Sequence, residues 1–313
     1  MSRPLVKLLA KLLAVCAGAA CAVAAPLPLG EIPSGGRFLV IQPHHDDHTW
    51  QYGHGGFIAK LVDAGWKGVY VRASNDEKDG SSGWGRNDQI NESEAIEATS
   101  HLGIEKVVSL NWRNDHMSSI PGNELRTQLI LLIRELKPDI VMSYNPWGHY
   151  DRNPDHRKVA RAVGEAIWLS GFATVNPEHA EVGAPPWRVP HAYFSQRSDY
   201  GKGYEPNVAI ELNAEQVARK GRAYWLHRNV RLNPATARSI RAKLDAQGLE
   251  IPELEGLDDE KATEKLQEWF MEWISRKRGE ENGVEFAEVF FHVGEWRAVP
   301  GLRRYLEENV QPR

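Results

Sequence analysis

Five consecutive residues, His44 to His48, supply three imidazoles and two carboxylates. They closely follow residues 38–42, whose apolar composition predicts a buried strand. Imidazole and carboxylate groups are ligands of catalytic zinc, which takes three protein groups and keeps one position open for water. In open α/β sheets, ligands bind just beyond the carboxyl ends of the strands. Composition and position together predict a metal site here, and a solvated loop is the alternative.

A second segment supplies a further candidate ligand. Residues 139–144 are predicted to form a strand, and a polar stretch after it ends in Asn153-Pro154-Asp155-His156. Asn followed by Pro is a good helix start, with Asn as the N-cap, and an acidic residue in the first turn complements the helix dipole. This capping interpretation accounts for Asn153 and Asp155 but leaves His156 unexplained. We therefore expect His156 to complete a three-ligand site at the same sheet edge.

The elements that must position these residues alternate along the chain. Short β-like runs and segments of helical periodicity predict βαβ units and a mainly parallel sheet. The expected strands are residues 38–42, 68–72, 107–111 and 139–144, and the helices between them are 55–64, 91–102 and 123–136. A long glycine-rich loop, residues 74–87, is of the kind that often covers a site.

The last third has a different character. Helical patterns over residues 214–228, 234–247 and 258–277 carry much charge, and a β-like run follows at 284–293. The charged helices are predicted to form a solvated flank, with Trp269 and Trp273 packing inward.

The composition is that of an ordinary globular protein. The chain has 313 residues, 42% of them hydrophobic, and a net charge of -4. Its 38 basic and 42 acidic residues form no basic block past the N-terminal segment, so we expect no nucleic-acid partner. The chain alone gives no indication of its oligomeric state.

The N-terminal segment, residues 1–25, is predicted to be a signal peptide. Positive charges precede an apolar stretch at residues 12–25, and Ala22-Val23-Ala24 offers a cleavage site. The apolar run is shorter than the roughly 20 residues of a spanning helix, so we expect no transmembrane segment in the mature protein. Export to the periplasm or the exterior follows. A lipoprotein signal is the less favoured alternative, using Cys16 or Cys21, the two cysteines of the chain.

The two polar segments resemble the motifs of a known family. Residues 43–48 look like the His-Pro-Asp-Asp-Glu motif of the PIG-L/LmbE-like zinc-dependent N-acetylglucosaminyl deacetylases, and residues 153–156 resemble its His-Pro-Asp-His motif. Shorter pieces agree in order with that family: Gly55-Gly56, Glu94 with Ala98 and Leu102-Gly103, Asp115 before Met117, Lys220 with Ala223 and His227, and residues 286–290.

This resemblance covers about residues 38–229 and the late strand. It implies an α/β fold, a Rossmann-like three-layer sandwich with a mainly parallel sheet. The expected organisation is a deacetylase core at 34–230, a helical C-terminal elaboration at 231–282, and a strand and tail at 283–313 that pack back on the core.

Carried over by position, the resemblance implies Zn²⁺ bound by His44, Asp47 and His156, with Asp46 as the general base. Adjacent Asp46 and Asp47 point in different directions, so one can bind metal while the other faces water. Iron, manganese or cobalt are alternatives to zinc, because carboxylate-containing sites also accept them.

The chain departs from the family pattern at three places. His45 and His48 replace a proline and a glutamate, and Asn153 replaces a histidine that stabilises the oxyanion or donates a proton. Asn153 can still donate a hydrogen bond but cannot act as an acid. His48, His149 and Tyr150 are alternative donors. Asn91 stands where the family usually has an arginine.

Three further residues are candidates for substrate binding. Arg86 is a candidate replacement for the missing arginine, with a surface charge as the alternative. By resemblance, Asp115 is a candidate acceptor for sugar hydroxyls, with a turn-forming role as the alternative, and His149 completes the set.

The function we expect is that of an exported zinc-dependent deacetylase that hydrolyses the N-acetyl amide of an N-acetylglucosamine-containing glycan or glycoconjugate. The alternatives are a zinc amidase acting on another exported acylated amine, and a non-catalytic relative that binds metal or sugar.

Overall fold

The computed structural model describes residues 26–32, 34–80, 86–147, 151–196, 204–231, 235–294 and 302–311. The predicted signal peptide, the candidate donors His149 and Tyr150, and part of the glycine-rich loop lie outside these residues. Within the described ranges, no helix combines the length and the apolar character that crossing a membrane requires.

One seven-stranded sheet organises the molecule, in the order β3-β2-β1-β4-β5-β7-β6. Every pair among β1 to β5 is parallel, and β7 runs antiparallel to both β5 and β6. The predicted mainly parallel α/β sheet is therefore confirmed. The strands are β1 (Arg37–Gln42), β2 (Lys67–Ser74), β3 (Lys106–Trp112), β4 (Ile140–Tyr144), β5 (His191–Ser195), β6 (Val208–Leu212) and β7 (Phe286–Val293).

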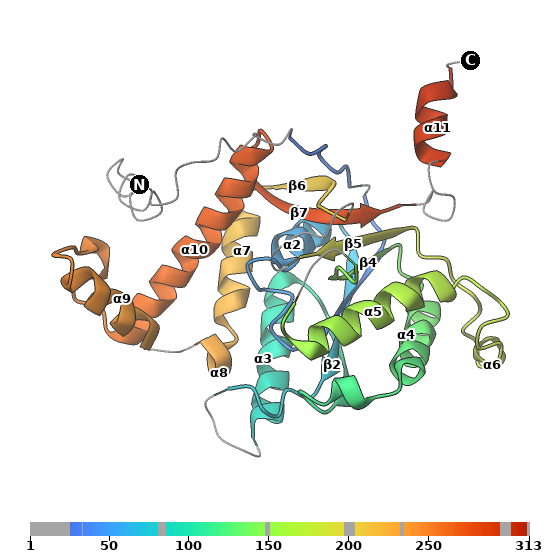
Figure 1. The fold of residues 1–313 in the computed structure, drawn as a ribbon, viewed down its shortest axis with the longest axis horizontal. Coiled ribbons are helices and arrows are strands. Elements are labelled where there is room, and N and C mark those ends of the chain that lie inside the picture. The colour runs from blue at the N-terminus through green and yellow to red at the C-terminus, as the bar shows by residue number, and fades with distance from the viewer. Residues whose placement is uncertain are drawn as a thin grey trace.

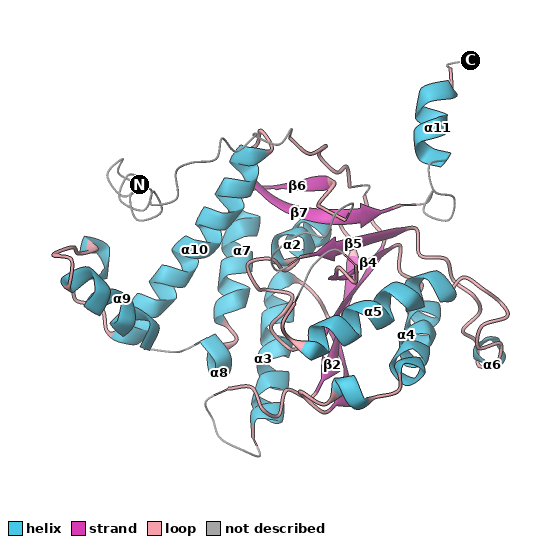
Figure 2. Ribbon diagram, in the orientation of Figure 1, coloured by secondary structure: helices cyan, strands magenta, loops and turns pink. Residues whose placement is uncertain are grey.

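Helices cover both faces of the sheet, which gives the three layers that the sequence predicts (Figures 1 and 2). Helices α2, α3 and α7 lie on one face, and α4 and α5 on the other. The helices are α2 (Gly55–Asp63), α3 (Asn87–Leu102), α4 (Gly122–Leu136), α5 (Pro154–Leu169), α6 (Glu178–Glu181), α7 (Ala214–Trp225), α8 (Arg228–Arg231), α9 (Ala235–Asp245), α10 (Asp259–Glu281) and α11 (Leu302–Asn309), with 3-10 turns η1 (Met117–Ser119) and η2 (Pro252–Leu254).

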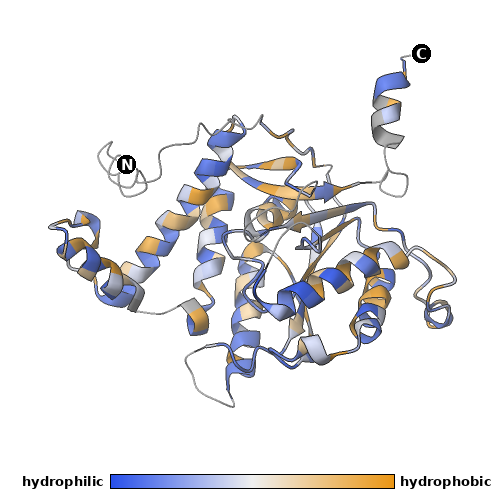
Figure 3. Ribbon diagram, viewed as in Figure 1, coloured by the Kyte–Doolittle hydropathy of each residue, from blue (hydrophilic) through white to orange (hydrophobic). Residues whose placement is uncertain are grey.

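Strand β1 is buried on both faces, and this fixes the loop that follows it. Phe38 and Val40 pack in the core beneath α2, α3 and α7, whereas Leu39 and Ile41 pack in the core beneath α4 and α5. Full burial of each such side chain contributes about 2 kcal/mol relative to exposure. On the helices that surround the sheet, such as α4 and α10, Figure 3 shows hydrophobic and hydrophilic residues alternating, as expected where one side of a helix is buried. The His44 to His48 segment therefore starts from a rigid support.

The structure differs from the sequence expectations in a few elements. Strands β5 and β6 were not predicted, because no helical pattern separates them in the sequence, and strand–helix alternation is what indicated the first four strands. The prediction that Trp273 packs inward is wrong: the residue is 41% exposed, and its ring stacks on Phe270. Helix α10 instead turns Met271 and Ile274 inward.

Residues of the C-terminal third are part of the sheet architecture. Strand β7 lies between β5 and β6, and α10 packs against α7 and β7. The division into a core, a helical elaboration and a tail stays a prediction.

Candidate metal centre

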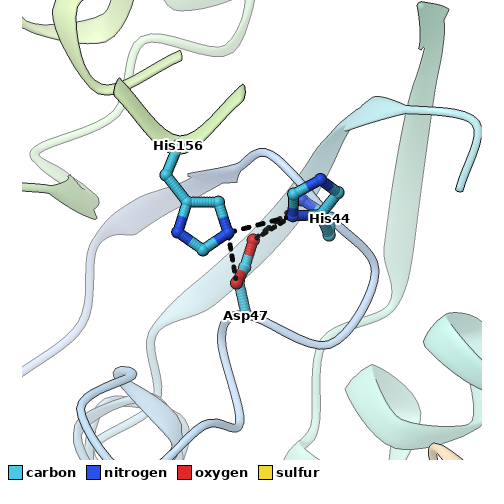
Figure 4. Close-up of side chains that lie close together, drawn as sticks. All are labelled: His44, Asp47 and His156. Atoms are coloured by element: carbon cyan, nitrogen blue, oxygen red, sulfur yellow. Dashed lines mark hydrogen bonds and ion pairs between the residues drawn. The ribbon is translucent and has the colours of Figure 1, made fainter. Parts of the chain in front are cut away.

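Two segments bring the three predicted ligands together. The loop after β1 carries His44 and Asp47, and the first turn of α5 carries His156. His44 Nδ1 is 3.1 Å from His156 Nε2 and 3.2 Å from Asp47 Oδ2, and His156 Nε2 is 3.4 Å from Asp47 Oδ1 (Figure 4). All three side chains are buried. Two imidazole nitrogens and a carboxylate therefore converge on one point.

These separations fit a divalent cation. Ligands about 2.1 Å from a tetrahedral metal lie roughly 3.4 Å from one another, close to the three distances in this cluster. Within the part of the chain that the structure describes, these residues form one of two groups whose ligand atoms are near enough to share an ion. The other group combines His44 with Asp76 and Asp79.

Each histidine of the cluster also faces a second carboxylate with its other ring nitrogen. His156 Nδ1 is 2.8 Å from Asp151 Oδ2, and His44 Nε2 is 3.6 Å from Asp155 Oδ2. Carboxylates placed this way fix the tautomer and orientation of metal-binding histidines. The Asp155 carboxylate also accepts the backbone N–H groups of Asp115 and Met117, at 2.7 Å and 3.3 Å. It therefore ties the loop after β3 to the start of α5.

Tyr144, the last residue of β4, holds two of the candidate ligands in place. Its hydroxyl donates to Asp47 Oδ1 at 2.8 Å, and its ring stacks on His156 with centroids 4.8 Å apart. The backbone N–H of His44 donates to Asp47 Oδ2 at 2.9 Å. These two donors orient the carboxylate toward the histidines.

The electrostatics of the cluster favour a bound positive charge. Burial opposes the charged form of His44, yet the carboxylates of Asp155 and Asp47 raise its pKa well above the ordinary value. Burial likewise opposes ionisation of Asp47, but His156 and His44 hold its pKa below the ordinary value. Nearby, burial raises the pKa of Asp79 to about 6, with Asp76 adding to the effect. A site with this carboxylate excess suits a cation.

Asp46 lies beside the three ligands with a different exposure. Its side chain is half-buried, whereas that of Asp47 is buried. Both the backbone N–H and the hydroxyl of Thr49 donate to the Asp46 carbonyl, at 3.0 Å and 2.9 Å. The Asp46 carboxylate is close enough to Asp47 to oppose the ionisation of Asp47, an effect that on its own raises the pKa of that group, and it is the more exposed of the two.

The remaining two histidines of the segment point into the protein. His48 packs on Tyr70, with ring centroids 4.2 Å apart, and meets the edge of His227. Burial lowers the pKa of His48 to about 3, so the ring is neutral at pH 7. His45 also contacts His227, and its Nδ1 is 3.4 Å from Asp76 Oδ2. Burial opposes the charged form of His45, but Asp76 raises its pKa.

The other predicted site residues are more dispersed. Asn153 is the N-cap of α5, and its side chain accepts from the backbone N–H of Asp155 at 2.9 Å, which confirms the capping interpretation. Asp115 exposes 54% of its side chain, and Lys78 approaches its carboxylate at 3.8 Å. Arg86 is exposed and immediately precedes α3. Among described contacts, none links Arg86 to the three ligands.

Tyr144 and Asp151 were not predicted to belong to the site, and Asp155 was predicted only as an acidic residue of the helix cap. Tyr144 is the last residue of β4, at the sheet edge where the site was expected, so its position could have indicated a role in the site. Asp151 acts from an irregular segment, where residue spacing does not predict geometry.

The sequence of this chain is similar to those of known deacetylases. Residues 39–167 match the model of the PIG-L family, described as GlcNAc-PI de-N-acetylase. Diacetylchitobiose deacetylase from Thermococcus kodakarensis is 26% identical over 187 residues, which cover 57% of this chain and 67% of that protein.

Solved structures share the fold. N,N'-diacetylchitobiose deacetylase from Pyrococcus horikoshii, in complex with an inhibitor, matches with a TM-score of 0.61 and 23% identity, covering 83% of this chain and 84% of that one. GalB, the 4-carboxy-2-hydroxymuconate hydratase from Pseudomonas putida, matches with a TM-score of 0.58 and 15% identity, covering 83% and 97%. One fold thus serves more than one reaction, and the site must decide between them.

Proposed function

Residues 39–167 of this chain belong to the PIG-L family, and from this premise we propose that the protein is a metal-dependent N-deacetylase acting on N-acetylglucosamine-containing glycans or glycoconjugates. The observation that carries the proposal is the convergence of His44, Asp47 and His156, with half-buried Asp46 alongside. A site that only stored metal would have no need of a carboxylate beside its ligands.

Zinc is the metal we propose, because two imidazoles, one carboxylate and an open position are a frequent zinc set. When bound there, the cation would lower the pKa of water and polarise an amide carbonyl. His44, Asp47 and His156 would hold it, and Asp151, Asp155 and Tyr144 keep those ligands in place.

Asp46 supplies the proton transfers. Its carboxylate takes a proton from the attacking water while the oxygen bonds to the acyl carbon. The same carboxyl group then donates that proton to the amine nitrogen as the carbon–nitrogen bond breaks. Acetate and a free amino sugar are the products. Asn153 does not take part as an acid, because an amide has no such proton and its oxygen caps α5.

Export is part of the proposal. The charged and apolar pattern of residues 1–25 with its Ala-Val-Ala site supports a periplasmic or secreted enzyme. A glycan or glycoconjugate outside the cytoplasm is a substrate that such a protein would meet.

The direct test is acetate release by the purified mature protein from N-acetylglucosamine and N,N'-diacetylchitobiose. We expect activity that a chelator abolishes and added zinc restores. Asp46→Asn should lower kcat by about 1,000-fold, within the range for a general base, while metal content by mass spectrometry stays unchanged. Asp245→Asn, the same charge change at an exposed position of α9, is the matched control.

Full activity in Asp46→Asn would contradict the mechanism. Stoichiometric zinc without release of acetate from any N-acetylated sugar would contradict the deacetylase assignment. If acetate appeared only from acylated amino acids or peptides, the protein would be an amidase on another acylated amine.

A further inference from the structure

The loop after β2, residues 75–80, brings one further carboxylate to the metal centre. A carboxylate oxygen of Asp79 lies within 4.8 Å of a ring nitrogen of His44. A metal bound to His44 would add roughly 2 to 4 Å to that separation. Burial raises the pKa of Asp79 to about 6, and among the nearby charges Asp76 and Asp46 add to this shift. Asp79 therefore lies beside both a metal ligand and the proposed general base.

Asp79 differs from the other charged side chains of this loop, each of which has a partner of opposite charge. These pairs are Asp76 with Arg72 at 3.2 Å, Glu77 with Arg113 at 2.9 Å, and Lys78 with Asp115 at 3.8 Å. Among the described residues, none donates a hydrogen bond to the Asp79 carboxylate, and no lysine or arginine pairs with it. Asp79 is half-buried, so its carboxylate has lost part of its hydration without compensation. It therefore favours a ligand that brings a positive charge.

A metal at the centre does not supply that charge. The two positive charges of a divalent ion would be balanced by the Asp47 ligand together with Asp151 and Asp155, the carboxylates that face the two histidines. Asp46, which is half-buried, adds another negative charge. The surroundings of Asp79 therefore stay negative when a metal is bound, and they favour a cationic ligand over a neutral or an anionic one.

A second metal ion, held by His44, Asp76 and Asp79, is the alternative use of this carboxylate. Both oxygens of Asp76 are already in use, however. Its Oδ1 accepts from the Ser74 hydroxyl at 2.6 Å, and its Oδ2 accepts from the backbone N–H of His45 at 3.1 Å. Without Asp76 only two ligands remain, fewer than the three or four protein groups of a zinc site. The contacts therefore favour substrate binding by Asp79.

Two buried asparagines fix the backbone that presents Asp79. Asn91 of α3 donates from Nδ2 to the carbonyls of Asp76 and Asp79, at 3.0 Å and 2.9 Å. Asn229 of α8, a helix that lies beside α3 in Figure 1, donates to Asn91 Oδ1 at 2.8 Å. A Cβ atom added to Gly80 would lie 2.1 Å from Asn229 Nδ2, so the loop packs directly on that side chain. Asn91 is neutral and thus brings no positive charge to Asp79.

We propose that Asp79 binds a protonated amino group of the substrate, so that the site prefers glycan chains that already carry a free amino sugar. This selectivity rests on the proposed deacetylase function, whereas binding of the amino group does not require turnover. Hydrolysis of one N-acetyl amide by water gives acetate and leaves an ammonium group on the chain. The class of reaction that supplies the preferred substrate is therefore N-deacetylation, and a first turnover on a chain would favour the next.

The test compares matched disaccharides by isothermal titration calorimetry at pH 7. N,N'-diacetylchitobiose is neutral, and each of its two mono-N-acetylated forms carries one free amine in place of one acetamido group. All three are titrated into zinc-loaded Asp46→Asn protein, which prevents turnover and removes the other half-buried carboxylate. We expect at least one mono-N-acetylated form to bind about fivefold more tightly than the neutral sugar. Adding Asp79→Asn should bring the ratio of the two affinities close to one.

Glu77→Gln is the matched control, because it removes one negative charge from the same loop at a carboxylate that is committed to Arg113. It should change the ratio of the two affinities by less than about twofold. Mass spectrometry measures bound zinc in every variant. We expect the zinc content of Asp79→Asn to equal that of its parent, and a loss of zinc would make Asp79 a metal ligand and overturn the proposal.

Equal affinities for the three sugars would also overturn it, as would an effect of Glu77→Gln as large as that of Asp79→Asn. Acetate release by the wild-type protein is measured separately. Absence of acetate, with a preference for the free amine that depends on Asp79, would contradict the deacetylase assignment and leave the role of Asp79 in amine binding standing.

Discussion

His44 and His48 lie four residues apart in one loop and have opposite environments. His44 faces the Asp47 and Asp155 carboxylates, which raise its pKa well above the ordinary value despite burial. His48 packs against Tyr70 and His227, and burial lowers its pKa to about 3. One imidazole is placed to meet a cation, and the other serves as a neutral ring of the interior.

The difference shows that residue type alone does not define a ligand. Both side chains are buried, so burial does not separate them either. What separates them is the number of carboxylates within reach of the ring nitrogens. The following predictions test this distinction between the histidines of the metal cluster and the histidines held neutral in the interior.

The largest effect is expected from substituting one histidine of each kind. His44→Ala should weaken zinc binding by about 1,000-fold or more, beyond the roughly 10- to 100-fold typical of losing a group that only orients a ligand. His48→Phe keeps a ring on Tyr70 and should change zinc affinity by less than about threefold. Competition with a chromogenic chelator measures both. Equal losses in the two variants would refute the distinction.

Asp151 should come next, because it orients a ligand without binding the metal. Asp151→Asn replaces the charged partner of His156 Nδ1 and should weaken zinc binding by roughly 10- to 100-fold. Asp88→Asn, a change at an α3 position away from the cluster, is the control for loss of one negative charge. An affinity within twofold of wild type would show that the 2.8 Å contact does not position the ligand.

A further buried histidine, His54 just before α2, should make the fold sensitive to acid. His54 is buried, donates from Nε2 to the Tyr193 carbonyl and stacks on Phe290, and burial lowers its pKa to about 3. Its unfolded-state pKa is about 6.5, so the unfolded chain binds the extra proton between these values. The stability that neutral His54 contributes is present above about pH 6.5 and is lost as pH falls toward 3.

At pH 5 this loss is about 2 kcal/mol relative to neutral pH. Urea unfolding of wild-type protein and His54→Gln at pH 7.5 and pH 5.0 measures it. The stability difference between the two proteins should shrink by about that amount at the lower pH. An unchanged difference would mean that His54 is not held neutral.

The smallest effect is expected from Tyr144→Phe. This change removes the hydroxyl that donates to Asp47 but keeps the ring that stacks on His156. Loss of one hydrogen bond to an oriented carboxylate should weaken zinc binding about fivefold, which corresponds to roughly 1 kcal/mol. Tyr305→Phe, an exposed tyrosine of α11, is the control. A loss of zinc affinity as large as that of Asp151→Asn would contradict the expected order of the two effects.

The sequence predicted the first four strands, the helices between them and the approach of His156 to His44 and Asp47. It could do so because β1 and β4 are apolar runs followed directly by polar clusters, and parallel strands bring such ends to one edge. It did not predict β5 and β6, because no helical pattern separates them and they fall outside the strand–helix alternation that indicated the first four strands. The roles of Tyr144 and Asp151 depend on side-chain directions in loops, which local sequence does not determine.

Anomalous X-ray diffraction at the zinc edge from crystals of the zinc-loaded protein tests the central claim most directly. The account predicts one strong peak per chain, within bonding distance of His44 Nδ1, His156 Nε2 and the Asp47 carboxylate, with Asp46 outside that shell. A peak among His45, His48 and His227, or no peak at the His44–Asp47–His156 cluster, would contradict it.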